Sequence, residues 1–348
     1  MSWWSGLGPR AGHRGALAVL ALVGVALALA ACGEVKTRLT PARGSVQPFT
    51  LMLDWVPNAD HVGLYEALAK GYFRQAALDV RVETPSYAAE PLELLAAGKI
   101  DAAISYEPQV LLARNAGAPV VSVAALVQKP LTSIISTGSQ HITTPQDLRG
   151  KTVGSDGVPY ENAFLDTILA HAHVPRSSVK VVNVGFNLVP AMLSGRVNAT
   201  ISGYWNYEAI QLRLDGKHPN VIPVNDAGVP SYNELVLVVR KSELERRTNL
   251  LRRFVQALGR GYEAVRADPV SAVRTLVRMN PSLNYRLQLA SVRATLPDYF
   301  PPAGKPWGWQ SQSQWHAFGE WMLGEHLIAN GQAIEDASTD KLLAGQGL

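Results

Sequence analysis

The chain has 348 residues, of which 32 are Lys or Arg and 28 are Asp or Glu. Residues 1–31 hold two of the basic residues, Arg10 and Arg14, and no acid, so the rest of the chain carries 30 basic and 28 acidic residues. This near balance argues against nucleic acid as a partner, because phosphate binding needs a concentrated basic face. The single cysteine, Cys32, excludes an internal disulfide and a thiolate metal site.

The N-terminus has the pattern of an export signal. After the two arginines comes an apolar run, Ala16 to Ala31, and its end, LAAC, resembles a bacterial lipobox, in which the cysteine is acylated. We therefore predict a lipoprotein signal peptide over residues 1–31 and lipidation of Cys32. A plain signal with an incidental cysteine is the alternative. The polar residues 32–47 lack periodicity and predict a flexible tether.

The stretch LDWVPNADHVGLYEALAKGYF, from Leu53 to Phe73, predicts a ligand-binding loop. The apolar run before it is β-prone, VPN is typical of a turn, and helical spacing follows up to Gly71. The α/β proteins place ligands where a strand leads into a helix N-terminus. The alternative is a capped loop whose tryptophan packs into the core. The candidate ligand-binding side chains here are Asp54, Trp55, Asn58 and His61.

Two later segments repeat one another. LLAAGKIDAAISYEP covers residues 94–108, and AMLSGRVNATISGYW covers residues 191–205. Each predicts a helix end, a glycine cap, a strand that ends in serine, and then aromatic and acidic residues. The upstream strand, loop and helix also recur, in KTVGSDGVPYENAFLDTIL at 151–169. Chance similarity among βα units is the alternative. The candidate ligand-binding residues in these segments are Tyr106, Glu107, Tyr160, Trp205 and Glu208.

Alternating strands and helices predict an α/β protein with parallel sheets. After the signal and tether, about 300 residues exceed one comfortable core, so we expect two α/β lobes. We assign 48–137 and 232–348 to the first lobe and 138–231 to the second, with the crossing near STGSQH, 136–141. Four strand-to-helix loops would then line a ligand cleft between the lobes.

The opening stretch, with ISYEP and GYWNYEAIQL, resembles the ThiY-like substrate-binding proteins of ABC importers, in the SsuA/ThiY-like superfamily. The resemblance implies a type II periplasmic-binding-protein fold, lipid-anchored outside the cytoplasm, with ABC permease and ATPase subunits as partners. It implies a planar heterocyclic ligand, a thiamine pyrimidine precursor of the hydroxymethylpyrimidine or formylaminopyrimidine type. The family also includes riboflavin binders, so riboflavin or another heterocycle is the alternative.

The resemblance extends to fungal thiamine-pyrimidine synthases, which use a cysteine cluster and surrender a histidine from this loop. His61 stands at the matching position, but no cysteine other than Cys32 is present. A nucleophile elbow, a P-loop and a His-Glu-x-x-His motif are also missing from the sequence. Asp54, Asp60 and His61 lack a recognised metal-ligand spacing. We therefore predict a binding protein and not an enzyme, with neither a cofactor nor a metal.

Overall fold

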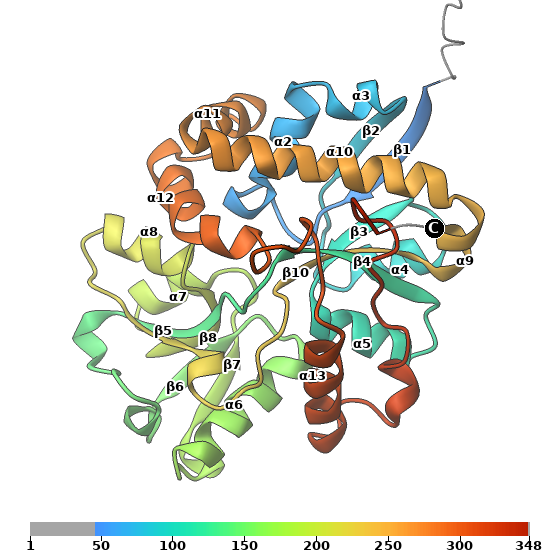
Figure 1. Cartoon of the computed structure of the whole chain (residues 1–348). Helices are drawn as coiled ribbons and strands as arrows, with labels where there is room; N and C mark the ends of the chain where they lie inside the picture. The colour runs from blue at the N-terminus through green and yellow to red at the C-terminus, as the bar shows by residue number, and fades with distance from the viewer. Residues whose placement is uncertain (1–45, 347–348) are drawn as a thin grey trace, which may run out of the picture. The chain divides into compact units, whose positions relative to one another are not determined.

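The computed structural model describes residues 46–346 (Figure 1). The predicted signal peptide, Cys32 and nearly all of the predicted tether lie outside the described residues. The last tether residue, Gln47, is already the first residue of strand β1. Within residues 46–346, the structure contains no helix that is long and apolar enough to cross a membrane.

Two five-stranded sheets form the framework. In the first sheet, β1 pairs in parallel with β2 and β3, and β10 is antiparallel to both β3 and β4. The strands in spatial order are β2 (Leu78–Glu83), β1 (Gln47–Met52), β3 (Ala102–Ser105), β10 (Leu235–Arg240) and β4 (Val120–Val127). The sequence correctly predicts the parallel strands, but the antiparallel members were not predicted.

The second sheet repeats this pattern. Here β6 is parallel to β7 and β8, and β5 is antiparallel to β8 and β9. The strands in spatial order are β7 (Lys180–Asn183), β6 (Thr152–Ser155), β8 (Ala199–Tyr204), β5 (Thr132–Ser136) and β9 (Asn220–Pro223). The repeated sequence segments contain β3 and β8, which occupy equivalent places. The antiparallel strand β10 lies beside β3, and the antiparallel strand β5 lies beside β8. Each of these two strands comes directly after the chain has crossed from the other sheet.

The helices fill the connections between strands and cover the sheets (Figure 1). Those of the second lobe are α6 (Pro159–His171), α7 (Leu188–Leu193) and α8 (Glu208–Leu214). The others are α2 (Val62–Ala69), α3 (Tyr72–Gln75), α4 (Glu90–Ala96), α5 (Glu107–Asn115), α9 (Lys241–Arg246), α10 (Thr248–Ala267), α11 (Pro269–Met279), α12 (Tyr285–Thr295) and α13 (Gln312–Gly324).

The chain crosses between the sheets at residues 128–131 and again between β9 and β10. The first crossing lies earlier than the predicted one, because β5 pairs with β8 and β9 although the sequence analysis assigned it to the first lobe. A buried carboxylate joins the two crossings. Oε2 of Glu234, just before β10, accepts the backbone N–H groups of Leu131 at 2.6 Å and Thr132 at 2.9 Å.

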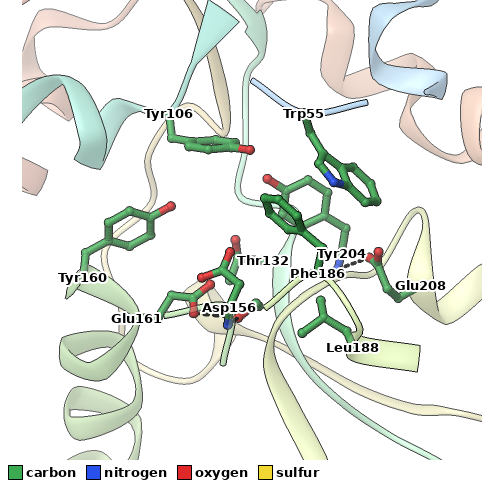
Figure 2. A pocket seen from close by; sticks show the side chains of 11 residues that line it. Trp55, Tyr106, Thr132, Asp156, Tyr160, Glu161, Phe186, Leu188, Tyr204 and Glu208 are labelled. Atoms are coloured by element: carbon green, nitrogen blue, oxygen red, sulfur yellow. Dashed lines mark hydrogen bonds between the residues drawn. The ribbon is translucent and has the colours of Figure 1, made fainter. Parts of the chain in front are cut away.

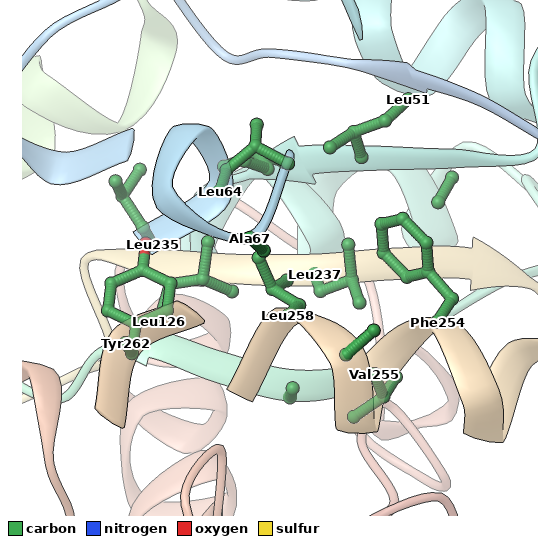
Figure 3. Packing of buried hydrophobic residues seen from close by; sticks show 14 of the residues in the cluster. Leu51, Leu64, Ala67, Leu126, Leu235, Leu237, Phe254, Val255, Leu258 and Tyr262 are labelled. Carbon is green, nitrogen blue, oxygen red and sulfur yellow. The ribbon is translucent and has the colours of Figure 1, made fainter. Parts of the chain in front are cut away.

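The core of the first lobe fixes helix α2, which follows the predicted ligand-binding loop. Helix α10 lies across α2 and contributes Phe254, Leu258 and Tyr262 to a buried cluster (Figure 3). A Cβ on Gly261 would lie 2.0 Å from the carbonyl oxygen of Gly63 in α2. The two helix backbones can approach this closely only because Gly261 has no side chain, and a Cβ on Gly63 would lie 2.3 Å from the Tyr262 ring. Close packing at this contact leaves the loop before α2 little freedom to shift.

Candidate functional site

A cleft receives side chains from both lobes (Figure 2). Trp55 and Tyr106 come from the first lobe, and the remaining residues come from the second. Those remaining residues are Thr132, Asp156, Tyr160, Glu161, Phe186, Leu188, Ser202, Tyr204 and Glu208.

Most lining residues follow the carboxyl end of a strand. Trp55 comes after β1, Tyr106 after β3, Asp156 after β6 and Glu208 after β8. Open α/β sheets place ligands at such ends, because the loops there converge and helices begin there. The structure therefore brings four predicted residues together in the cleft: Trp55, Tyr106, Tyr160 and Glu208.

Five predicted residues do not line the cleft, and three of them belong to the loop after β1. Asn58 is the N-cap of the 3-10 helix η1 (Ala59–His61): its Oδ1 accepts from the Asp60 amide at 2.8 Å, and its Nδ2 donates to the Val56 carbonyl. Asp54 and His61 are buried and face each other, with 2.7 Å between Asp54 Oδ1 and His61 Nε2. The sequence identified the right loop, but Asp54 and His61 form a hydrogen bond with each other in the interior and do not line the cleft.

Glu107 also points away from the cleft. It is fully buried, and its Oε2 accepts from Asn233 twice, from the backbone amide at 2.8 Å and from Nδ2 at 2.7 Å. Burial raises the pKa of Glu107 to about 8, and the two hydrogen bonds from Asn233 offset part of this rise. Its partner lies on the second crossing, so Glu107 holds helix α5 to the connection between the lobes.

Trp205 packs against the first-lobe core, and its indole N–H donates to the Pro130 carbonyl at 3.1 Å. Its predecessor Tyr204 lines the cleft instead. Strand β8 runs through Tyr204, and successive strand residues point to opposite faces. Ser202 and Tyr204 therefore share the cleft face, and Trp205 leaves it. The alternation in ATISGYW was a signal that the sequence analysis missed.

The other lining residues that sequence reasoning missed had weaker signals. Asp156 and Glu161 flank Tyr160 in GSDGVPYEN, a segment already assigned to the wall. Thr132 begins β5, whose place in the second sheet could not be predicted from its composition. Phe186 lies between β7 and α7 and Leu188 is the first residue of α7, and neither carries a motif that separates it from core residues.

Carboxyl groups dominate the polar part of the cleft. Oε2 of Glu161 accepts from the hydroxyls of Ser155 at 2.7 Å and Ser202 at 2.5 Å. Burial, with the nearby Asp156 carboxylate, raises the pKa of Glu161 well above its usual range. Oε2 of Glu208 accepts from the Tyr204 amide at 2.7 Å, and burial raises the pKa of Glu208 to about 7. Among residues 46–346, none of those that line the cleft is Lys, Arg or His.

Residues 58–272 match the family described as NMT1/THI5 like. The chain is also 33% identical over 323 residues to the formylaminopyrimidine-binding protein of Halalkalibacterium halodurans, an alignment that covers 92% of this chain and 97% of that relative. The chain belongs to the NMT1/THI5-like family.

Two further comparisons show the range of this family and of its fold. The 4-amino-5-hydroxymethyl-2-methylpyrimidine phosphate synthase THI13 of Saccharomyces cerevisiae is 26% identical over 251 residues, covering 69% of this chain and 73% of the enzyme. The solved structure of the alkanesulfonate-binding protein SsuA from Xanthomonas axonopodis pv. citri, bound to MOPS, superposes with a TM-score of 0.67 at 17% identity. That superposition covers 85% of this chain and 99% of SsuA, and it shows the two-lobe periplasmic-binding-protein fold.

In this NMT1/THI5-like chain the polar loop after β1 is already hydrogen-bonded within itself and to its neighbours. His61 is fully buried, and Oδ1 of Asp60 accepts from Asn206 Nδ2 at 2.8 Å. Among residues 46–346 the structure contains no group of three or more His, Cys, Asp or Glu side chains placed to hold a metal ion.

Proposed function

We propose that this protein is the solute-binding component of an ABC importer and captures a thiamine pyrimidine precursor outside the cytoplasm. Its similarity to the formylaminopyrimidine-binding protein extends over nearly the whole of both chains. The observation that carries the ligand assignment is the composition of the cleft: aromatic rings and carboxyl groups, without a basic side chain.

The aromatic side chains suit a flat heteroaromatic ring. Trp55 lies at the mouth between the lobes, with its ring centroid 5.7 Å from that of Tyr207 and 5.9 Å from that of Phe186. Offset or edge contacts of a bound ring with such side chains contribute about 0.5–1.5 kcal/mol each beyond buried area. The ring of an aminopyrimidine would add one more member to this set.

The carboxyl groups suit the amino group of an aminopyrimidine. Glu208 lies across the cleft from Tyr160 and Glu161 (Figure 2). An ionised carboxylate accepts hydrogen bonds from an exocyclic amino group, and such charge-assisted bonds are about twice as strong as neutral ones. We assign Glu208 as the principal acceptor, because its Oε1 is not engaged by the Tyr204 amide that holds Oε2.

The same groups argue against the ligand class of the structural relative. A sulfonate such as the MOPS bound to SsuA is an anion, and among the residues that the structure describes the cleft wall offers no Lys, Arg or His to pair with it. An anion that is buried without a cationic partner pays a large desolvation cost.

The binding role is favoured over the synthase activity of the yeast relative. The ring of His61 does not line the cleft, and both of its nitrogens are within hydrogen-bond distance of a partner, Asn58 N or Asp54 Oδ1. Incubation with iron and pyridoxal phosphate should leave the mass of the protein unchanged. A mass loss at His61 would instead support the enzyme.

Calorimetry and mass spectrometry test the ligand. Formylaminopyrimidine should bind tightly, whereas MOPS and riboflavin should bind weakly or not at all. Mass spectrometry of material released from the denatured purified protein should detect a pyrimidine. Release of a flavin, or tight binding of the sulfonate without binding of the pyrimidine, would refute the assignment.

Membrane attachment is part of the same proposal. A lipid on Cys32, followed by the polar residues ahead of β1, would tether the binding unit beside its permease and ATPase partners. A flexible tether of this length keeps the local concentration of the binding protein near the permease high.

A further inference from the structure

The buried loop after β1 fixes the hydrogen position on His61. The backbone N–H of Asn58 points at Nδ1 of His61, 3.3 Å away, so Nδ1 must act as an acceptor. The hydrogen of the neutral ring is then on Nε2, which lies 2.7 Å from Asp54 Oδ1. This tautomer is assigned from the hydrogen-bond network, and it makes Asp54 the acceptor of the pair.

The other oxygen of Asp54 receives the hydroxyl of Tyr106. Tyr106 Oη donates to Asp54 Oδ2 at 2.9 Å, and Asp54 is only 3% exposed. Burial raises the pKa of Tyr106 well above its usual range, so the phenol keeps the hydrogen that it donates. Tyr106 lines the cleft (Figure 2). Since its hydrogen is committed to Asp54, its oxygen offers only lone pairs to a ligand.

Three more hydroxyls of the cleft are arranged in the same way. Ser202 donates to Glu161, whereas Thr132 and Tyr204 donate to Glu234 at 3.1 Å and 3.3 Å. Glu234 is held as an acceptor by the two backbone amides at the first crossing. Among the described lining residues, Tyr160 is the hydroxyl without such a carboxylate.

We propose that Asp54 and His61 are positioning residues that hold the Tyr106 hydroxyl as a hydrogen-bond acceptor, and that Glu234 does the same for Tyr204 and Thr132. The cleft would then select ligands that present N–H groups over ligands of equal shape that present a carbonyl oxygen at the same place. This inference rests on the proposed function, and it gives a role to the DWVPNADH residues that do not touch the cleft.

Asp54→Asn tests the hydrogen bonds that Asp54 accepts from His61 and Tyr106. An amide has the shape of a carboxylate but carries two hydrogens. Its oxygen would accept from His61, and its nitrogen would donate to Tyr106, whose own hydrogen would turn into the cleft. The probes are 4-amino-5-hydroxymethyl-2-methylpyrimidine and its 4-oxo analogue, with both Kd values measured by calorimetry at one pH. The wild type should prefer the amino compound by about tenfold, since a mismatched buried polar pair costs a factor of that order.

In Asp54→Asn this preference should fall by about tenfold, since one hydroxyl has changed from acceptor to donor. Glu234→Gln makes the same exchange at Tyr204, because its amide oxygen would stay with the two backbone amides and its nitrogen would take the place of Oε1. It serves as the second variant if Asp54→Asn does not fold. Tyr106→Phe should weaken binding of the amino compound without improving that of the oxo compound. Glu66→Gln is the matched control: Glu66 is a buried carboxylate of α2, paired with Lys70 and not part of the cleft wall, so the preference should remain.

The outcomes separate this inference from the function it rests on. If the wild type binds neither pyrimidine, the proposed function fails and the inference falls with it. If the wild type binds both compounds equally, or if Asp54→Asn lowers both affinities in parallel, the inference is overturned while pyrimidine binding stands. A lowered or inverted preference in the folded variant supports it, because a purely structural role for Asp54 would not change the ratio.

Discussion

Replacing Glu107 by glutamine should stabilise the protein in alkaline solution and change its stability little near pH 4.5. Glu107 is fully buried, and its Oε1 lacks a hydrogen-bond partner among the described residues. In Glu107→Gln the amide oxygen can accept from Asn233 as Oε2 does now. The amide nitrogen then takes the place of the protonated oxygen, so the variant imitates the neutral acid.

The magnitude follows from the pKa of this carboxyl group, which burial raises from 4.5 to about 8. Between these two pH values the folded chain keeps a proton that the unfolded chain has released, so the free energy of unfolding falls as pH rises. Each pKa unit corresponds to about 1.4 kcal/mol, so the wild type should lose about 5 kcal/mol over this interval. Glutamine does not titrate, and the variant should avoid this loss.

Urea denaturation at pH 4.5, 6 and 9 would measure the difference between the two proteins. The difference in the free energy of unfolding should grow from nearly zero at pH 4.5 to about 5 kcal/mol at pH 9, because all other titrating groups are common to both chains. Glu243 is the matched control: it is also buried, but Arg240, Arg246 and Arg247 lie within 3.6 Å. Glu243→Gln should therefore destabilise the protein at pH 9. Parallel pH profiles for wild type and Glu107→Gln would refute the reasoning.

Three further predictions address the cleft, the core and the membrane anchor. Glu208→Ala should weaken binding of formylaminopyrimidine by about 1–3 kcal/mol in calorimetry, because a buried amino group loses its acceptor. A change below about 0.5 kcal/mol would remove Glu208 from the ligand site. Trp205→Phe should lower the melting temperature, since the hydrogen bond to Pro130 is lost, but leave Kd unchanged; weaker binding at unchanged stability would contradict this. Cys32→Ser should abolish fatty-acid labelling and membrane partitioning, and persistent labelling would exclude Cys32 as the lipidation site.

The sequence by itself determined the order of the elements and the loops that form the cleft. Hydrophobic runs, turn residues and the repeated glycine-strand-serine pattern are local signals, and local preferences mark where strands end and helices begin. Trp55, Tyr106, Tyr160 and Glu208 were found in this way, because a ligand site in an α/β sheet lies at strand ends.

Only the tertiary structure decided which way each side chain at a strand end points. Tyr106 and Glu107 are adjacent in sequence, yet one lines the cleft and the other bonds to Asn233 on the second crossing. That choice depends on where helix α5 packs and on a partner 126 residues away, neither of which local sequence specifies. The side chains of Asp54 and His61 likewise point into the interior, because there Asp54 forms hydrogen bonds with both His61 and Tyr106. The place of β5 in the second sheet also depends on the tertiary structure. The composition of β5 does not specify that it pairs with β8 and β9.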